Sequence, residues 1–191
     1  MIVMKLKTLV NDEVTAYWFE EMIKLENILF PPTGNDYLSP EYVRSLYEKS
    51  KEGLFFSIDE ETNQLAGYFT VIFIDEEQKN HYLNGGHFSE LQNIGMQKGE
   101  NIIYLYTIAV DEKYRGQSCM KDMGKAFAHF LDEKEKEGYF VKEVYAEAVS
   151  QAGAKSLTKG FEMSPMQDVN EQGIGHYESK DLLVKYRKKM R

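Results

Sequence analysis

The chain has 191 residues, a formal net charge of −8, and 42% hydrophobic and 28% charged residues. These values are ordinary for a soluble globular protein, and the length suits a single domain, predicted over residues 1–191. An acidic chain of this size lacks the basic footprint of nucleic-acid binding, so nucleic acid is not expected as a partner. The one cysteine, Cys119, excludes an internal disulfide and favours a reducing, cytoplasmic location.

The sequence also argues against metal and membrane functions. The four histidines show no ligand spacing, so no metal site is expected. The N-terminal segment interleaves charges with apolar residues too closely for a signal-peptide core, and no apolar run is long enough to cross a membrane. We therefore expect neither a metal nor a membrane partner.

Hydrophobic spacing predicts alternating strands and helices, because apolar residues alternate in strands and recur three or four positions apart in helices. Capping residues mark helix starts: Asn11 and Asp12 before the first helix, Ser39 and Pro40 before the second. The predicted strands cover residues 1–10, 54–59, 65–74, 102–110, 141–150, 161–166 and 182–187. The predicted helices cover residues 13–30, 40–52, 119–137 and 151–159. The order is β-α-α-β-β-β-α-β-α-β-β.

Two places depart from these regular patterns. Gly67, inside the third predicted strand, indicates a bulge or the close approach of another backbone. Residues 75–100 are polar and glycine-rich, with only a short helix predicted at 89–96. We interpret them as an insertion that covers a substrate cleft, with a flexible excursion as the equally weighted alternative.

The most informative stretch covers residues 102–131, where a buried strand, a basic glycine-containing turn and a helix follow one another. The first amides of a helix have no intrahelical acceptor, and the helix dipole concentrates partial positive charge there. Such a helix start suits a phosphate group. We therefore expect this stretch to hold the pyrophosphate of a nucleotide-bearing cofactor.

Two segments and the element order resemble a known family. The segment TIAVDEKYRG at residues 107–116 and the segment VYAEAVSQAGAKSLTKGF at residues 144–161 are similar to signatures of the GNAT superfamily of acyl-CoA-dependent N-acyltransferases. The resemblance extends over nearly the whole chain. It implies an α/β fold of the α+β type, with a mixed, mostly antiparallel, splayed sheet flanked by helices. It also implies acetyl-CoA as cofactor and direct acetyl transfer to an amine of a small molecule or a protein.

The resemblance also implies the cofactor contacts. The pyrophosphate loop of the family has the form Arg-Gly-x-Gly-hydrophobic-Gly/Ala, and here Ser118 and Met120 replace two of its small residues. The preceding strand would pair with the pantetheine arm as with an added strand. The expected cofactor-binding residues are Ile108, Ala109, Val110, Arg115, Gly116, Gln117, Ser118, Cys119, Met120, Ser150 and Lys155.

The catalytic assignments are fewer. In the family the thioester carbonyl sits near the backbone amide of the residue matching Tyr106, which would stabilise the oxyanion. Glu147 and Glu100 are the acids near the expected cleft. Glu147 is the candidate base, with an exposed or salt-bridged strand residue as the alternative. No tyrosine matches the general acid of the family in residues 156–158. Cys119 is expected to be a packed side chain rather than a nucleophile.

Two other functions stay open at this point. One is a GNAT-like binding module with weak or lost CoA binding, acting through protein contacts; the two replaced residues of the loop favour it. The other is acetylation of an amine carried on a nucleic acid, which the acidic charge opposes. The sequence leaves the oligomeric state open, a homodimer included.

Overall fold

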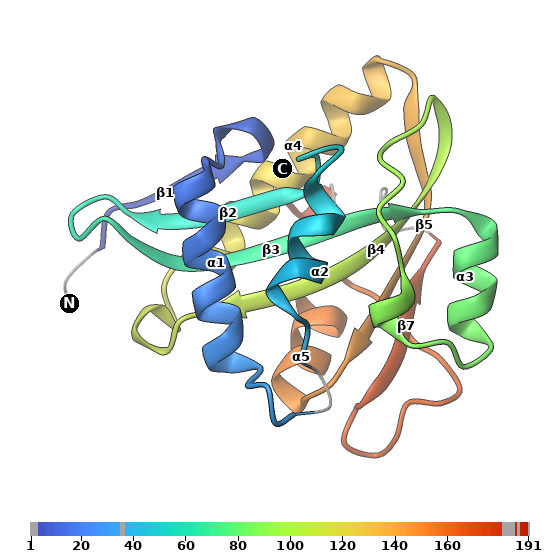
Figure 1. The fold of residues 1–191 in the computed structure, drawn as a ribbon. Helices are drawn as coiled ribbons and strands as arrows, with labels where there is room; N and C mark the ends of the chain where they lie inside the picture. The colour runs from blue at the N-terminus through green and yellow to red at the C-terminus, as the bar shows by residue number, and fades with distance from the viewer. Residues whose placement is uncertain (1–3, 35–36, 181–185, 187, 191) are drawn as a thin grey trace. The chain divides into compact units, whose positions relative to one another are not determined.

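The structure, a computed structural model, describes residues 4–34, 37–180, 186 and 188–190. Its strands form one mixed sheet of seven, in the order β1-β2-β3-β4-β5-β7-β6 (Figure 1). β4 and β5 are parallel, whereas the β1–β2, β2–β3, β5–β7 and β6–β7 pairs are antiparallel. The strands are β1 Leu6–Val10, β2 Leu54–Asp59, β3 Gln64–Ile74, β4 Gly99–Val110, β5 Tyr139–Ala148, β6 Ser164–Pro165 and β7 Gly175–Ser179. The helices are α1 Ala16–Leu29, α2 Pro40–Tyr47, α3 Glu76–Leu83, α4 Cys119–Lys136 and α5 Gln151–Lys155.

The chain divides into two compact units, with boundaries inside β3, β4 and α4. Unit 1 comprises Met1–Val71 and Thr107–Phe127, and unit 2 comprises Ile72–Tyr106 and Ala128–Arg191. The mixed, mostly antiparallel sheet flanked by helices confirms the predicted fold class. A single domain over residues 1–191 stays a prediction. Across the described ranges, no helix has both the length and the apolar character that a membrane span requires.

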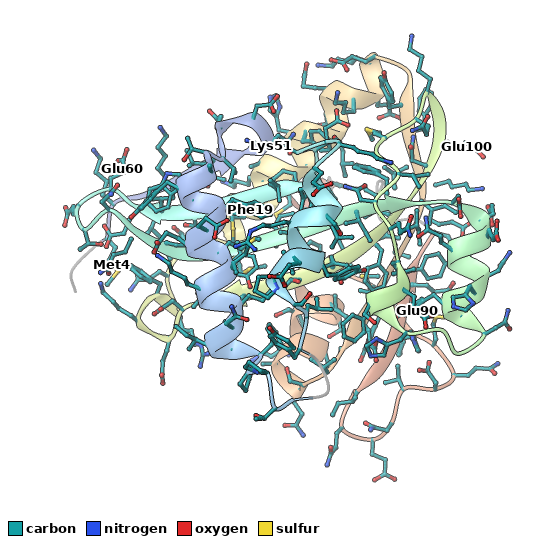
Figure 2. The ribbon with its side chains drawn as sticks, viewed as in Figure 1. Met4, Phe19, Lys51, Glu60, Glu90 and Glu100 are labelled. Atoms are coloured by element: carbon teal, nitrogen blue, oxygen red, sulfur yellow. The ribbon has the colours of Figure 1, made fainter. Side chains whose placement is uncertain are left out.

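In unit 1, α1 and α2 lie in front of β2 and β3 in the view of Figure 1. The predicted start of α2 is confirmed: the Ser39 hydroxyl accepts from the Tyr42 amide at 3.2 Å, and Pro40 occupies the first helical position. The ring of Phe19, labelled in Figure 2, meets the ring of Tyr47 edge-on with centroids 5.8 Å apart. This contact joins α1 to α2 above the sheet.

Aromatic side chains form another part of the core of unit 1. Phe55 of β2 and Phe69 of β3 stack with centroids 4.6 Å apart. Phe127 of α4 meets both rings edge-on, at 5.3 and 5.2 Å, and all three side chains are fully buried. Truncating such a ring to alanine costs about 3–5 kcal/mol, so this cluster fixes α4 against the two strands.

Gly67 confirms the predicted close approach. A Cβ atom on Gly67 would lie 2.8 Å from the carbonyl oxygen of Ala109 and 3.2 Å from the Cα atom of Val110. The β2–β3 register also shifts beside it, between Ser57 and Ile58. Glycine at this position therefore lets β4 run close to β3.

The start of the chain corrects one prediction. α1 begins at Ala16, and the Asn11 side chain does not cap it. Instead, the Asn11 side-chain oxygen accepts from the backbone amides of Gly53 and Leu54, at 2.8 and 3.3 Å. The prediction of a helix cap at Asn11 is therefore wrong. The Asn11 side chain makes long-range hydrogen bonds instead, and these hold the end of β1 to the start of β2.

Residues 75–100 are more regular than predicted. They contain α3, whose first turn is capped by the Asp75 side chain accepting from the Gln78 amide at 2.8 Å. The short helix predicted at 89–96 is wrong, because only one turn forms, at Phe88–Glu90. The last residues, Gly99 and Glu100, already belong to β4.

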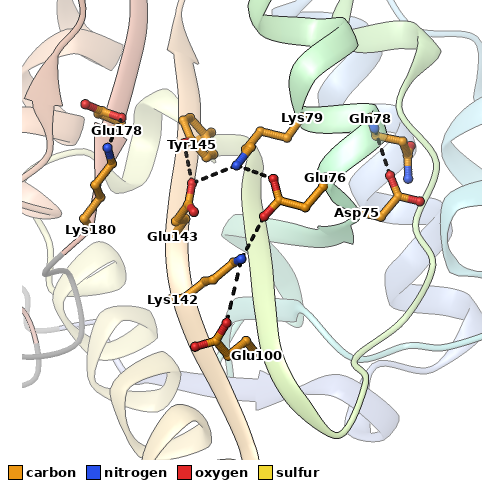
Figure 3. Close-up of polar contacts among 10 residues, drawn as sticks. All are labelled: Asp75, Glu76, Gln78, Lys79, Glu100, Lys142, Glu143, Tyr145, Glu178 and Lys180. Atoms are coloured by element: carbon orange, nitrogen blue, oxygen red, sulfur yellow. Dashed lines mark hydrogen bonds and ion pairs between the residues drawn. The ribbon is translucent and has the colours of Figure 1, made fainter.

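Ion pairs tie α3 to β5 (Figure 3). Lys79 of α3 contacts Glu143 of β5 at 3.3 Å, and Lys142 of β5 contacts Glu76 of α3 at 2.7 Å. Lys142 also reaches Glu100 of β4 at 3.8 Å. The hydrogen bonds from Lys142 and Lys79 lower the pKa of Glu76 to about 2. Lys79 and Glu143 have side chains that are 12% and 18% exposed, so this pair is shielded from solvent.

The C-terminal part corrects two further predictions. The strand predicted at 161–166 shrinks to Ser164–Pro165, and β7 forms at Gly175–Ser179, inside the stretch expected to be a connection. The strand predicted at 182–187 lies outside the described residues except for Tyr186, whose backbone is helical.

Candidate active site

Strand β4 continues beyond its pairing with β5. The parallel ladder begins at Gly99–Tyr139 and its last pair is Leu105–Ala146, whereas β4 runs on to Val110. In this fully described stretch, the five residues after Leu105 have no partner on β5. Since an unpaired strand edge can accept an added strand, this extension is the element that a pantetheine arm could pair with. Three predicted cofactor-binding residues lie on it: Ile108, Ala109 and Val110.

The predicted pyrophosphate loop forms a tight turn before α4. Gly116 has a φ of 81°, a conformation that suits glycine because it has no Cβ. The Gln117 amide donates to the Tyr114 carbonyl at 3.2 Å and so is committed within the turn. In the described chain, the next three amides, those of Ser118, Cys119 and Met120, donate to no backbone carbonyl. These are free donors at the start of an 18-residue helix.

The turn is anchored by the buried Tyr114, which is 1% exposed. Its hydroxyl donates to the Asp59 carboxylate at 2.9 Å. The hydrogen bond from Thr62, then that from Tyr114, lowers the pKa of Asp59 despite its burial. The turn is therefore fixed to the end of β2, which holds the free amides in place.

Ser118 and Asp122 make the loop less favourable as an anion site. The Ser118 hydroxyl donates to the Asp122 carboxylate one turn into α4, so that hydroxyl is already committed. An acid in the first turn of a helix is favourable toward the dipole but repels a nearby phosphate. Arg115, by contrast, is exposed at the same turn and supplies positive charge. The loop thus carries both attractive and repulsive groups.

Cys119 is a packed side chain, 1% exposed. Burial raises the pKa of its thiol, which disfavours the nucleophilic thiolate. The predicted structural role of this cysteine is therefore supported.

In unit 2, the candidate base Glu147 accepts a hydrogen bond from the Tyr82 hydroxyl at 3.1 Å. The same hydroxyl lies 3.1 Å from that of Tyr104, whose ring meets the Tyr106 ring with centroids 5.9 Å apart. Burial raises the pKa of Tyr82 far above its ordinary value. Glu147 is thus part of a tyrosine chain rather than a free or salt-bridged strand acid. Sequence reasoning missed Tyr82 because α3 was interpreted as irregular.

The other two predicted cofactor residues also belong to unit 2. The Ser150 hydroxyl accepts from the Gly153 amide at 3.1 Å and so caps α5. Lys155 is exposed in the last turn of α5. Both lie around one short helix, and their role toward a cofactor stays a prediction.

Glu26, on α1 in unit 1, was not predicted. It is 6% exposed, and one carboxylate oxygen accepts from the Thr107 hydroxyl of β4 at 3.2 Å. Burial raises the pKa of Glu26 to about 7, although the Thr107 bond acts in the opposite direction. The spacing of apolar residues contained a signal: the four-residue series Val14, Trp18, Met22 continues at Glu26, which places an acid on the buried face.

A family model described as "Acetyltransferase (GNAT) family" matches residues 19–151. The match covers more than half of the chain, and the chain belongs to this family. It includes most of α1, the β4 extension, the loop before α4 and the first residue of α5. A comparison with curated proteins finds no match.

Solved structures share the fold at low sequence identity. NAA60 of Arabidopsis thaliana, crystallised with acetyl-CoA, is 14% identical with a TM-score of 0.58, over 91% of this chain and 97% of that chain. A chain of the NatC complex bound to Gag peptide and CoA is 15% identical with a TM-score of 0.56, over 92% and 96%. An aminoglycoside acetyltransferase from an uncultured soil metagenomic sample, in complex with sisomicin, is 18% identical with a TM-score of 0.51, over 88% and 93%.

Proposed function

We propose that this protein transfers the acetyl group of acetyl-CoA to an amine by direct attack, without an acyl-enzyme, and that residues 1–191 act as one acetyltransferase domain. The observation that carries the proposal is the β4 extension beyond Leu105, followed by the free amides of Ser118, Cys119 and Met120. One element offers an unpaired strand edge and the next offers anion donors. Their order along the chain matches a pantetheine arm followed by a pyrophosphate.

Each residue would then have a definite task. Backbone groups of Ile108 and Val110 would bind the pantetheine arm, and Arg115 would neutralise the pyrophosphate. The amide of Tyr106 would donate to the thioester oxygen, where negative charge develops during attack. Bound acetyl-CoA would supply an activated acyl group, so the protein needs no nucleophile of its own. Ser150 and Lys155 are further candidate cofactor contacts.

The acceptor would be an amine of a peptide, a protein or a small molecule. Similar folds occur with both classes, since NatC was crystallised with a peptide and the metagenomic enzyme with sisomicin. Four partly exposed rings on α1, on α2 and between them would contact the acceptor: Trp18, Phe30, Tyr37 and Tyr42. Cys119 as the single, buried cysteine fits a reducing compartment, and we place the protein in the cytoplasm.

The Ser118–Asp122 pair favours a second candidate function. It removes one hydroxyl donor from the loop and adds a carboxylate near the proposed phosphate position. If this repulsion dominates, CoA binding is weak or lost, and the protein acts as a GNAT-like module through protein contacts.

Calorimetry with acetyl-CoA separates the two functions, followed by free-thiol release on three probe amines: the pentapeptide MVNAL, sisomicin and benzylamine. Binding together with amine-dependent thiol release supports the enzyme. Absence of binding heat at millimolar acetyl-CoA supports the binding module. A matched variant, Arg115→Gln, removes one positive charge from an exposed position and is expected to weaken binding about tenfold, as for the loss of one charge-assisted hydrogen bond.

A further inference from the structure

Unit 1 contains a buried acid, Glu26, that no cation of the described residues neutralises, and such burial lowers the stability of the fold. Glu26 lies on the buried face of α1, where Met22, Ile23 and Leu25 are its buried neighbours. Within the described part of the chain, its carboxylate accepts one hydrogen bond, from a neutral donor, the Thr107 hydroxyl. Burying an ionisable group in this way costs free energy that an apolar residue would not cost. The position therefore calls for an explanation beyond packing.

Among the described residues, the groups that interact with Glu26 are neutral at ordinary pH. They are Tyr47 on α2, Tyr68 on β3 and Thr107 on β4. Together with Glu26 itself, we call these side chains the Glu26 cluster. Among the residues that the structure describes, no cationic side chain acts on the ionisation of Glu26, whose pKa is raised by burial and lowered by the Thr107 hydrogen bond. A positive charge brought to this cluster would thus find an unneutralised carboxylate.

Tyr68 supplies an independent observation. Its side chain is fully buried, yet within the described residues its hydroxyl makes no hydrogen bond. The Tyr47 hydroxyl, by comparison, donates to the Val71 carbonyl at 3.5 Å. Buried hydroxyls are nearly always paired, so an unpaired one beside a buried acid indicates a missing polar partner. A ligand amine or a water molecule is a suitable partner.

One member of the cluster is the next residue in the sequence after a residue of the proposed reaction centre. Thr107 directly follows Tyr106, whose amide we assigned to the thioester oxygen, and it lies on the β4 extension beyond Leu105. A group held by Thr107 is therefore held by the cofactor strand. The other candidate, Glu147, already accepts from Tyr82.

We propose that Glu26 is the general base that takes a proton from the acceptor ammonium, with Thr107 as a positioning residue; this assignment rests on the proposed function. The acceptor enters as R–NH₃⁺, and one N–H proton moves to the Glu26 carboxylate, which becomes neutral. The freed amine forms the N–C bond as the C–S bond breaks. A second proton of that nitrogen goes to the leaving thiolate, and Glu26 releases its proton to solvent. Atoms and charge balance without another reactant.

Two variants and one control test the assignment. Glu26→Gln keeps the shape and can still accept from Thr107, but it cannot take a proton. Glu21→Gln is the matched control on the same helix, because Glu21 pairs with Lys24 at the surface. Thr107→Val removes the hydroxyl that favours the ionised carboxylate. The rates of thiol release with MVNAL, sisomicin and benzylamine are measured against pH, together with acetyl-CoA binding by calorimetry.

We expect Glu26→Gln to bind acetyl-CoA as the wild type does and to lose about 100-fold or more in kcat/KM for the amine. In wild type, the rate decreases as the pH is lowered through about 7, which gives the pH–rate profile an acidic limb. This acidic limb disappears in Glu26→Gln. In Thr107→Val the limb moves to higher pH, a change that a purely structural role would not produce. Glu21→Gln leaves rate and profile unchanged.

Three results overturn the assignment. One is a Glu26→Gln rate within threefold of wild type, and another is an unchanged acidic limb in that variant. The third combines two observations. Wild type binds acetyl-CoA but transfers acetyl to none of the three probes, and a ¹³C-glutamate titration gives Glu26 an ordinary carboxyl pKa. Failure of the wild type to bind acetyl-CoA is a different result, since it overturns the proposed function and with it this assignment.

Discussion

The ionisation of Glu26 predicts a pH-dependent stability that one substitution removes. In the folded protein its pKa lies at about 7, against an ordinary value of 4.5. One pKa unit corresponds to about 1.4 kcal/mol, so ionising Glu26 costs the folded state about 3 kcal/mol relative to the unfolded chain. Replacing Glu26 with glutamine removes this cost, because the amide stays neutral and can still accept from Thr107.

The sign follows from proton uptake. Between pH 4.5 and about 7 the folded state binds more protons at Glu26 than the unfolded state does. The contribution of this group to the free energy of unfolding is therefore fully present below pH 4.5 and falls by about 3 kcal/mol as the pH rises to about 7. Relative to wild type, Glu26→Gln should gain that amount over the same range.

Urea unfolding measures this difference, with the single tryptophan, Trp18 on α1, as the fluorescent probe. The stabilities of wild type, Glu26→Gln and the control Glu21→Gln are compared at pH 4.5 and at about pH 8, on either side of the titration. The Glu21→Gln curve should run parallel to wild type. If the Glu26→Gln curve also runs parallel, Glu26 titrates as an ordinary carboxyl and the burial argument is wrong.

Three other substitutions address the loop before α4 and strand β4. Asp122→Asn removes the carboxylate beside Ser118 and should tighten acetyl-CoA binding in calorimetry, by about threefold to tenfold for one unfavourable charge; unchanged affinity would show that this charge does not face the phosphate. Gly116→Pro cannot adopt a φ of 81°, so it should abolish cofactor binding while circular dichroism stays native; normal binding would exclude this loop as the site. Gly67→Ala places a Cβ 2.8 Å from the Ala109 carbonyl and should cost about 1–3 kcal/mol of stability, measured by urea unfolding; a neutral effect would mean that β4 shifts freely.

Local patterns in the sequence predict the structure correctly where the residues of one element determine its conformation. The cap of Ser39 and the proline after it predict α2 because both act within four residues. Gly67 predicts a close backbone approach because no other residue fits one. The strand, turn and helix at residues 102–131 form as predicted, and the three free amides lie where a helix start must leave them.

Local patterns do not predict the structure of elements whose conformation depends on contacts with residues far away in the sequence. α3 has no apolar stripe, and it is attached through Tyr82 and through Lys79 and Glu76, which all contact side chains of β5 more than sixty positions away. β7 is short and polar, and it becomes a strand through its pairing with β5. Asn11 has the chemistry of a cap but bonds to amides across the sheet. No periodicity within one segment contains these partners.

Glu26 depends both on a local pattern and on a long-range contact. Its place on the buried face of α1 follows from spacing alone, whereas its chemistry depends on Thr107, which lies 81 positions later on β4. A general base works best with a pKa near ambient pH, and a carboxylate reaches that range when it is buried away from cations. The same burial costs the fold about 3 kcal/mol, an amount that a leucine at this position would not cost. The presence of an acid at position 26 is explained if Glu26 takes up the proton that the acceptor amine must lose.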